Sequence, residues 1–242
     1  MPGTRRVFRS VDLVLSCEHG GNRVPERYRR LIPRSVLTTH RGHDPGALEA
    51  ARAIAAFMRA PLLYSTVSRL LVELNRPLGH HQVFSAYSQT LAPSEREELL
   101  QSYYWPYWRS VQARVRRSLR HGRGVLHLSV HSFTPRLRGV RRMADIGLLF
   151  DPRCREEARF CELWRREILR ALPRLRVRHN YPYRGTGEAL TTSLRREHAG
   201  EPYLGIEIEI NQRFPRGDRE RWRRLRRLLV EKIGVRARFL SN

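Results

Sequence analysis

The sequence has few cysteines, no long apolar run and almost no lysine, and each shortage narrows its possible functions. The three cysteines, Cys17, Cys154 and Cys161, match neither a zinc ribbon nor a Cys-x-x-Cys redox motif, so we expect reduced and mostly buried thiols. No apolar run approaches the roughly 20 residues that span a bilayer, and we find no secretory signal near the first residues. We therefore expect a cytoplasmic protein with no membrane partner.

Arginine supplies nearly all of the positive charge. Lysine and arginine together number 47 against 23 acidic residues, a formal net charge of +24, and Lys232 is the only lysine. A nucleic-acid-binding surface gains from clustered charge, whereas these arginines are spread along the whole chain. In the densest stretch, residues 213–238, Trp222, Leu225 and Leu229 recur at helical spacing, which favours an amphipathic surface helix with a basic outer face. We therefore disfavour nucleic acid as a partner.

The length and the apolar pattern predict one α/β domain over residues 1–242. A chain of 242 residues, 40% hydrophobic and 29% charged, is long enough for one large core. Helices are expected to begin near Pro45, Ser94, Arg155 and Asp218, the second with a capping box of Ser94 and Glu97. The alternation of strands and helices predicts a three-layer α/β/α sandwich around a mixed, mostly parallel sheet. The predicted strands are residues 11–17, 62–67, 70–74, 125–131, 145–150, 175–178 and 203–210.

Two histidines lie at the ends of apolar runs. In an α/β sheet, ligands bind just outside the carboxyl ends of the strands. His19 follows the first predicted strand and precedes two glycines, and His131 ends the fourth and precedes Ser132. Two imidazoles and one carboxylate, with one position left open for water, form the usual catalytic zinc site. Such an ion lowers the pKa of its water and polarises a carbonyl in amide hydrolysis. For either histidine alone, a structural role in the core is the alternative.

Asp44 has two interpretations. Because Pro45 and a helical pattern follow it, Asp44 is a good N-cap with proline at the first helical position. It also stands in the segment His40-Arg41-Gly42-His43-Asp44, which is rich in metal-ligand types. Both interpretations can hold, because a carboxylate has two oxygens.

The last predicted strand places Glu207 and Glu209 on one face. Adjacent carboxylates are costly to bury unless a cation, an arginine or a shared proton compensates. A metal site would supply this compensation, and a strand at a solvent-facing edge would avoid the cost altogether.

Asn75 and Arg76 place an amide beside a planar guanidinium at the end of an apolar run. This pair suits bidentate recognition of a substrate carboxylate. In a chain so rich in arginine, however, any single arginine is weak evidence.

Over roughly residues 11–215, a series of motifs resembles the N-formylglutamate amidohydrolase family. That family is itself similar to the zinc carboxypeptidase and aspartoacylase group, which has a phosphorylase/hydrolase-like α/β/α sandwich. The motifs, in order, are Glu18-His19-Gly20-Gly21-Asn22, His43-Asp44-Pro45-Gly46-Ala47, Ser68-Arg69, Leu74-Asn75-Arg76-Pro77, Val130-His131-Ser132-Phe133-Thr134-Pro135, Asn180-Tyr181-Pro182-Tyr183 and Ile206-Glu207-Ile208-Glu209.

The resemblance implies a role for each candidate residue. His19 and His131 would hold one zinc ion, and Glu209 would be the general base and acid. Arg76 would hold the α-carboxylate of an N-acyl amino acid. Carboxypeptidases have a glutamate three residues after the first histidine, where this chain has Asn22, so either Asp44 takes that role or the metal is bound more weakly. The residues expected to contact substrate beside Arg76 are Arg69, Asn75, Asn22, Ser132 and Glu207.

The resemblance thus implies a zinc-dependent amidohydrolase whose partner is a small N-acyl amino acid such as N-formylglutamate. Two alternatives remain open at this point. One is a non-catalytic basic protein on the same fold that binds RNA or another anionic partner through its arginines. The other is a peptidase that acts on short peptides or cell-wall fragments.

Overall fold

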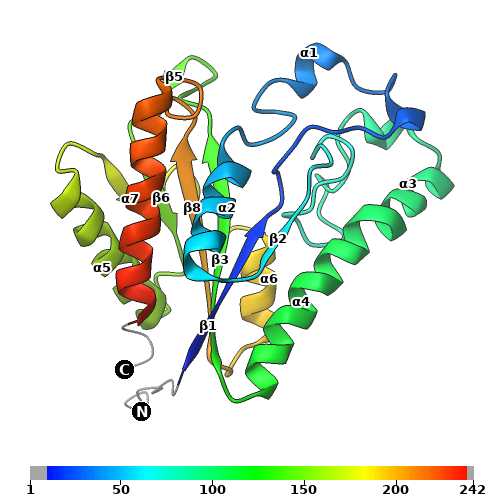
Figure 1. Ribbon diagram of the computed structural model, residues 1–242. Helices are drawn as coiled ribbons and strands as arrows, with labels where there is room; N and C mark the ends of the chain where they lie inside the picture. The colour runs from blue at the N-terminus through cyan, green and yellow to red at the C-terminus, as the bar shows by residue number, and fades with distance from the viewer. Residues whose placement is uncertain (1–9, 239–242) are drawn as a thin grey trace.

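The structure, a computed structural model, describes residues 10–238 and is built around a six-stranded mixed sheet (Figure 1). Across the sheet the strands lie in the order β2-β1-β3-β8-β6-β7. All neighbouring strands are parallel except β8 and β6, which are antiparallel to each other. The strands are β1 (Val11–Cys17), β2 (Leu62–Tyr64), β3 (Gly124–Phe133), β6 (Ile146–Leu149), β7 (Val177–His179) and β8 (Tyr203–Asn211).

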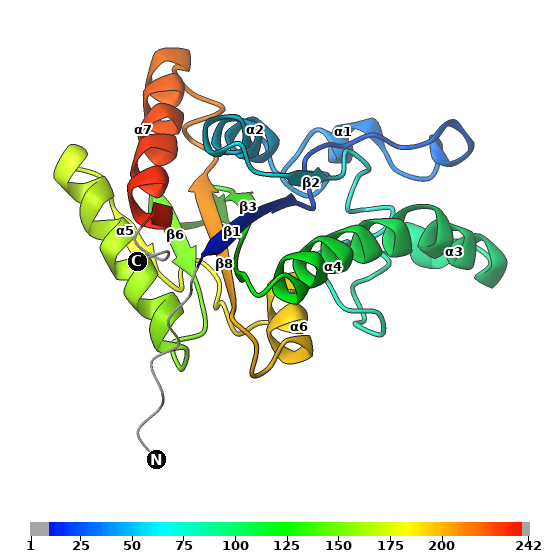
Figure 2. The ribbon, with the colours of Figure 1, turned by 60° about the horizontal axis from the view of Figure 1, so that its bottom comes forward.

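Helices cover both faces of this sheet, which confirms the predicted three-layer sandwich (Figure 2). One face packs against α2 (Ala47–Met58), α5 (Arg155–Ala171) and α7 (Arg219–Arg238). The other packs against α4 (Trp105–Arg120) and α6 (Leu190–Glu197). The shorter elements are η1 (Glu26–Tyr28), α1 (Arg34–Leu37), η2 (Ser88–Thr90), α3 (Pro93–Leu99), the π-helical turn η3 (Leu100–Tyr104) and the hairpin strands β4 (Arg136–Leu137) and β5 (Val140–Arg141).

The two central strands, β3 and β8, are buried along their whole length. Alternate residues of β3, among them Leu126, Leu128 and Val130, join the core under α2, α5 and α7. The opposite face of β3 carries polar side chains such as His127 and Ser129. Because β8 lies between β3 and β6, the proposal that its glutamates sit on a solvent-facing edge strand is wrong.

Two predicted strands differ from the structure. The strand expected over residues 62–67 ends at Tyr64, and Val67 only forms a single bridge with Arg23. No strand forms over residues 70–74, although the whole run is buried. Its backbone groups bond outside any sheet: Glu73 N–H donates to Val83 O, and Trp108 Nε1 donates to Leu74 O. The apolar side chains there pack against other loops and α3–α4 instead.

The helix starts also differ. The N-cap of α2 is Gly46, in a left-handed conformation with φ of 81°, so Asp44 does not cap this helix. The capping box of Ser94 and Glu97 is wrong, because α3 begins at Pro93 and Glu95 accepts from the Ala92 N–H instead. Helix α6 was not predicted, since a helix of only eight residues gives too short a pattern to recognise.

Two smaller expectations, for the cysteines and for α7, are confirmed. The three cysteines are free, with Cys17 and Cys161 buried and Cys154 half-buried. In α7, Trp222 and Leu225 face the core, as the helical spacing predicted. Within the part of the chain that the structure describes, no helix combines the length and apolarity that a membrane span requires.

Candidate functional site

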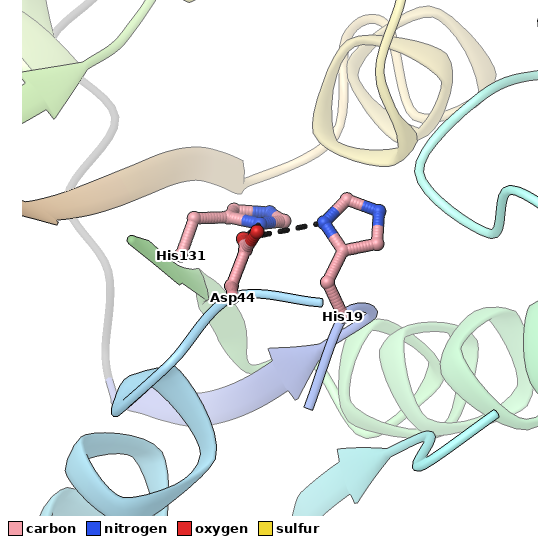
Figure 3. Close-up of side chains that lie close together, drawn as sticks. All are labelled: His19, Asp44 and His131. Atoms are coloured by element: carbon pink, nitrogen blue, oxygen red, sulfur yellow. Dashed lines mark hydrogen bonds and ion pairs between the residues drawn. The ribbon is translucent and has the colours of Figure 1, made fainter. Parts of the chain in front are cut away.

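His19, Asp44 and His131 meet at the carboxyl end of the parallel strands. The Asp44 Oδ2 atom lies 3.3 Å from His19 Nδ1 and 3.0 Å from His131 Nδ1. Figure 3 shows the Asp44 carboxylate between the two imidazole rings, whose centroids are 5.0 Å apart. All three side chains are buried. The two histidines, 112 positions apart in sequence numbering, therefore converge as the sequence predicted.

Parallel pairing and one tight turn bring these residues together. His131 lies in β3, and His19 follows β1, the neighbouring parallel strand. The turn after β1 packs closely on the segment that contains Thr66. A Cβ at Gly21 would lie 2.6 Å from Thr66 O, and only glycine avoids this clash. The Asp44 N–H donates to His19 O at 2.9 Å, so the loop before α2 is fastened to that turn.

Two glutamates that were not predicted as site residues contact the outer nitrogens of the imidazoles. His19 Nε2 contacts Glu73 Oε1, and His131 Nε2 lies 3.1 Å from Glu18 Oε2. Glu18 also accepts hydrogen bonds from the hydroxyls of Ser129 and Tyr107, at 2.7 and 2.8 Å. Each histidine therefore presents Nδ1 to the centre and Nε2 to a carboxylate.

A sequence signal existed for both glutamates. Glu73 interrupts the apolar run from Leu70 to Leu74, and Glu18 follows a buried strand directly. A carboxylate in such a position must find a cation or hydrogen-bond donors, because burying it alone is costly. The histidines at the strand ends, His19 and His131, are the candidate partners for such a carboxylate.

The carboxylates around the histidines are stabilised in their charged form. Burial acts to raise the pKa of Asp44, but His19, His131 and Arg69 together hold it well below its usual range. Burial likewise opposes ionisation of Glu18 and Glu73, whose pKa values are nevertheless lowered, by His131 and Ser129 for Glu18 and by Arg69 for Glu73. The site therefore concentrates negative charge that a bound cation would balance.

Glu209 lies opposite His131 in the β3–β8 ladder and behaves differently from these carboxylates. It is buried, and burial raises its pKa to about 8, with Asp44 and Glu207 adding to the effect and His131 opposing it. Its Oε2 atom is buried without a hydrogen-bond partner among the described residues. A carboxyl group so placed is available to exchange a proton near neutral pH.

The two predicted arginines have different surroundings. Arg69 spans the site: its guanidinium lies 3.2 Å from Asp44 Oδ1 and donates through Nε to Glu73 Oε2 at 2.9 Å. Arg76 donates instead to the backbone oxygen of Glu188, before α6, and pairs with no carboxylate in residues 10–238. The structure therefore brings Arg69 into the histidine cluster and leaves Arg76 beside it.

Of the other residues expected to contact substrate, two lie against the histidine cluster and two make contacts elsewhere. The Asn75 amide nitrogen lies 3.3 Å from His131 Nε2, and the Ser132 N–H lies 3.4 Å from Asp44 Oδ2. Glu207 is buried in β8 and accepts from the Thr191 hydroxyl at 2.6 Å. Asn22, in contrast, donates its amide to Leu37 O at 3.1 Å and joins two loops.

The donor set fits a divalent metal ion. The ligand atoms of His19, Asp44 and His131 all lie within 4.8 Å of one another, so this group could hold a metal. In a tetrahedral zinc site the ligand atoms are about 3.3 Å apart, close to the spacing from Asp44 Oδ2 to the two Nδ1 atoms. Carboxylates on the outer imidazole nitrogens are the usual companions of metal-binding histidines.

Comparisons with known proteins identify the family and the fold of this chain. The family model for N-formylglutamate amidohydrolase matches residues 11–214. The crystal structure of a gene product from Agrobacterium tumefaciens is 27% identical, with a TM-score of 0.76 over 93% of this chain and 91% of that one. The crystal structure of N-formylglutamate amidohydrolase from Ralstonia eutropha JMP134 is 20% identical, with a TM-score of 0.77 over 96% and 94%, a likeness of fold. No curated protein matches the chain.

Proposed function

Because the chain belongs to the N-formylglutamate amidohydrolase family, we propose that it is a zinc-dependent amidohydrolase that cleaves the linear amide of a small N-acyl amino acid. Family membership makes it an amidohydrolase. The zinc dependence, the substrate and the residue roles are our proposal. It rests on one observation above all: a buried His-Asp-His group beside Glu209 on the adjoining strand, whose Oε2 atom has no hydrogen-bond partner among residues 10–238.

Each residue of the site has a defined task in this proposal. His19, Asp44 and His131 hold the ion, which when bound lowers the pKa of water and polarises the amide carbonyl. Glu209 takes a proton from the attacking water and passes it to the leaving amine nitrogen. Its raised pKa suits both steps, because a group that titrates near neutral pH can accept and return a proton.

The substrate is oriented by the residues around the ion. Arg76 has no carboxylate partner in the described chain and is expected to hold the α-carboxylate, with Asn75 beside it. Arg69 is tied to Asp44 and Glu73 and is only partly exposed, so it positions those carboxylates and stands at the edge of the substrate space. Correct orientation of the amide itself contributes a large part of the rate enhancement.

Metal content and hydrolysis test the proposal together. Purified protein should contain about one zinc per chain, and it should release formate from N-formylglutamate. A chelator should abolish the release and added zinc should restore it. His131→Ala should lose both the metal and the activity. Protein free of metal, with RNA retention that falls steeply as salt rises, would support a binding protein instead.

A further inference from the structure

A further buried imidazole, that of His127, lies in β3 on the same face of the strand as His131. Its side chain is fully buried, and each of its ring nitrogens contacts a hydroxyl. The Ser16 hydroxyl lies 2.8 Å from His127 Nε2, and the Tyr203 hydroxyl lies 2.7 Å from His127 Nδ1. None of these three side chains has a role in the proposed reaction.

The contacts continue from Ser16 to the metal-binding group. Burial opposes ionisation of Glu18, but hydrogen bonds from His131 and, more weakly, from Ser16 help to lower the pKa of this carboxyl. Glu18 Oε2 lies 3.1 Å from His131 Nε2. Five hydrogen-bonding side chains thus form one buried series, which in order is Tyr203, His127, Ser16, Glu18 and His131.

The carboxylate of Glu18 determines the direction of the hydrogen bonds in this series. An ionised carboxylate only accepts, so the Ser16 hydroxyl donates its single hydrogen to Glu18. Ser16 Oγ must then accept from His127 Nε2–H, and His127 Nδ1 is left to accept from the Tyr203 hydroxyl. Because burial lowers the pKa of His127 to about 4, its ring is neutral near pH 7 and carries one hydrogen, as this arrangement requires.

Gly205 makes room for the hydroxyl at the far end of the series. It pairs with His127 in the β3–β8 ladder, and a Cβ at this position would lie 3.0 Å from Tyr203 Oη. The phenol therefore lies over Gly205 and reaches the imidazole on the neighbouring strand. Tyr203 Oη has no other hydrogen-bond partner among the described residues. Donation to His127 satisfies its hydrogen, which the reverse direction would leave buried without an acceptor.

We propose that Tyr203 and His127 are positioning residues of the metal site. Tyr203 holds His127 in the form that carries its hydrogen on Nε2. This form keeps the Ser16 hydrogen directed at Glu18. Glu18 in turn keeps the hydrogen of His131 on Nε2 and leaves Nδ1 free to bind the ion. The inference rests on the proposed function, because the residues it assigns act on the same metal site.

The variant Tyr203→Phe removes the donor that fixes this arrangement. The His127 ring can then carry its hydrogen on Nδ1 instead. Nε2 in that form accepts from Ser16, so the hydroxyl turns away from Glu18, and His131 is held less firmly. The zinc affinity should fall about 2- to 10-fold, the effect of one neutral hydrogen bond. Competition with a chromophoric chelator measures it.

Two further variants separate positioning from general effects on the core. Tyr28→Phe is the matched control, because Tyr28 is also buried but its hydroxyl has no partner among residues 10–238, and the zinc affinity should stay unchanged. Ser16→Ala interrupts the series and should lower the affinity at least as much as Tyr203→Phe. In the Ser16→Ala protein, Tyr203→Phe should have no further effect, because residues that act through one another are not additive. Additive losses, or an unchanged affinity in Tyr203→Phe, would overturn the inference.

The position of the hydrogen on His127 can be measured without any metal. Nitrogen NMR of isotope-labelled, metal-free protein distinguishes the two ring nitrogens, and wild type should carry the hydrogen on Nε2. His127→Gln, which lacks the ring, assigns the signal. Tyr203→Phe should add the form with the hydrogen on Nδ1, and Tyr28→Phe should not. A wild-type ring with its hydrogen on Nδ1, or a ring that Tyr203→Phe leaves unchanged, contradicts the inferred direction.

Failure of this inference and failure of the proposed function give different results. If wild type binds zinc and releases formate from N-formylglutamate, but Tyr203→Phe binds zinc equally well, only the inference fails. If wild type binds no zinc, the proposed function fails, and with it the positioning of a metal ligand. The NMR signal of the metal-free protein then still decides whether Tyr203 fixes the hydrogen of His127.

Discussion

His131 is held between Glu18 and Asp44: its Nε2 atom lies 3.1 Å from Glu18 Oε2, and its Nδ1 atom 3.0 Å from Asp44 Oδ2. His19 repeats the pattern between Glu73 and the same Asp44 oxygen. A carboxylate on Nε2 favours the proton there and leaves Nδ1 as the electron-pair donor. The two outer glutamates therefore orient both rings toward one point.

Glu18→Gln is expected to weaken metal binding about 10- to 100-fold, since loss of a companion carboxylate has an effect of this size. Competition with a chromophoric chelator would measure the affinity. Glu207→Gln is the matched control, because Glu207 is also buried but accepts from Thr191, and it should leave the affinity unchanged. Equal affinity in Glu18→Gln and wild type would show that Glu18 does not orient His131.

Glu209→Gln is expected to keep the metal and lose the reaction. The neutral amide cannot take a proton from water, and general acid–base catalysis contributes about 10²- to 10⁴-fold, so kcat should fall by that factor. Metal content, measured on the same sample, should stay at the wild-type value because Glu209 is outside the His-Asp-His group. Activity within a few-fold of wild type would remove Glu209 from the proton transfer.

Gly147→Ala is expected to destabilise the fold. Gly147 pairs with Glu209 in the β6–β8 ladder, and a Cβ there would lie 1.8 Å from Tyr181 O and 3.3 Å from Glu209 Cβ. The carbonyl belongs to the backbone and cannot turn aside, so the loss should be about 1–3 kcal/mol, as for other overpacked sites. Urea denaturation would measure it. Gly187→Ala, whose nearest contact is Arg184 O at 3.2 Å, should cost less.

His127 is expected to make the protein less stable in mild acid. Burial lowers its pKa to about 4, so between pH 6.5 and 4 the unfolded chain binds a proton at this position and the folded protein does not. The free energy of unfolding therefore decreases as the pH is lowered through this window, by roughly 2 kcal/mol from pH 7 to pH 5 for this group. Denaturation at the two pH values would reveal it.

The variant His127→Gln should remove that part of the pH dependence, because glutamine does not titrate. His121→Gln, at an exposed histidine, should follow the wild-type curve. If His127→Gln loses as much stability on acidification as wild type, the buried imidazole is not the cause.

The fold could be predicted from sequence where burial and periodicity agree. Strands β1, β3 and β8 are long and lie at or next to the centre of the sheet, so their apolar runs are continuous or alternate clearly. The run over residues 70–74 has the same composition but is buried by loops. Composition alone does not distinguish these two kinds of burial, because both remove the side chains from water.

The convergence of two members of the candidate metal site could be predicted because His19 and His131 stand where strands end. His19 and His131 converge through the parallel pairing of β1 and β3, a strand order that the sequence did not indicate. The sequence indicates that Glu18 and Glu73 need partners, but which imidazole nitrogen each one contacts depends on ring orientation and on a loop path that no local pattern records. Asp44 was ambiguous for a related reason: the turn at Gly46 starts α2 later than the proline suggested.

The alternation of β8 has a consequence for how the chemistry is kept in place. Its even-numbered isoleucines, Ile206, Ile208 and Ile210, fill the core under α5 and α7, while the odd-numbered Glu207 and Glu209 face the other way. A slip of one position against β3 would exchange the two sets and bury carboxylates in hydrocarbon. Burial of the isoleucines on the apolar face of β8 therefore fixes the register of the strand. That register determines that Glu207 and Glu209 lie on the opposite face.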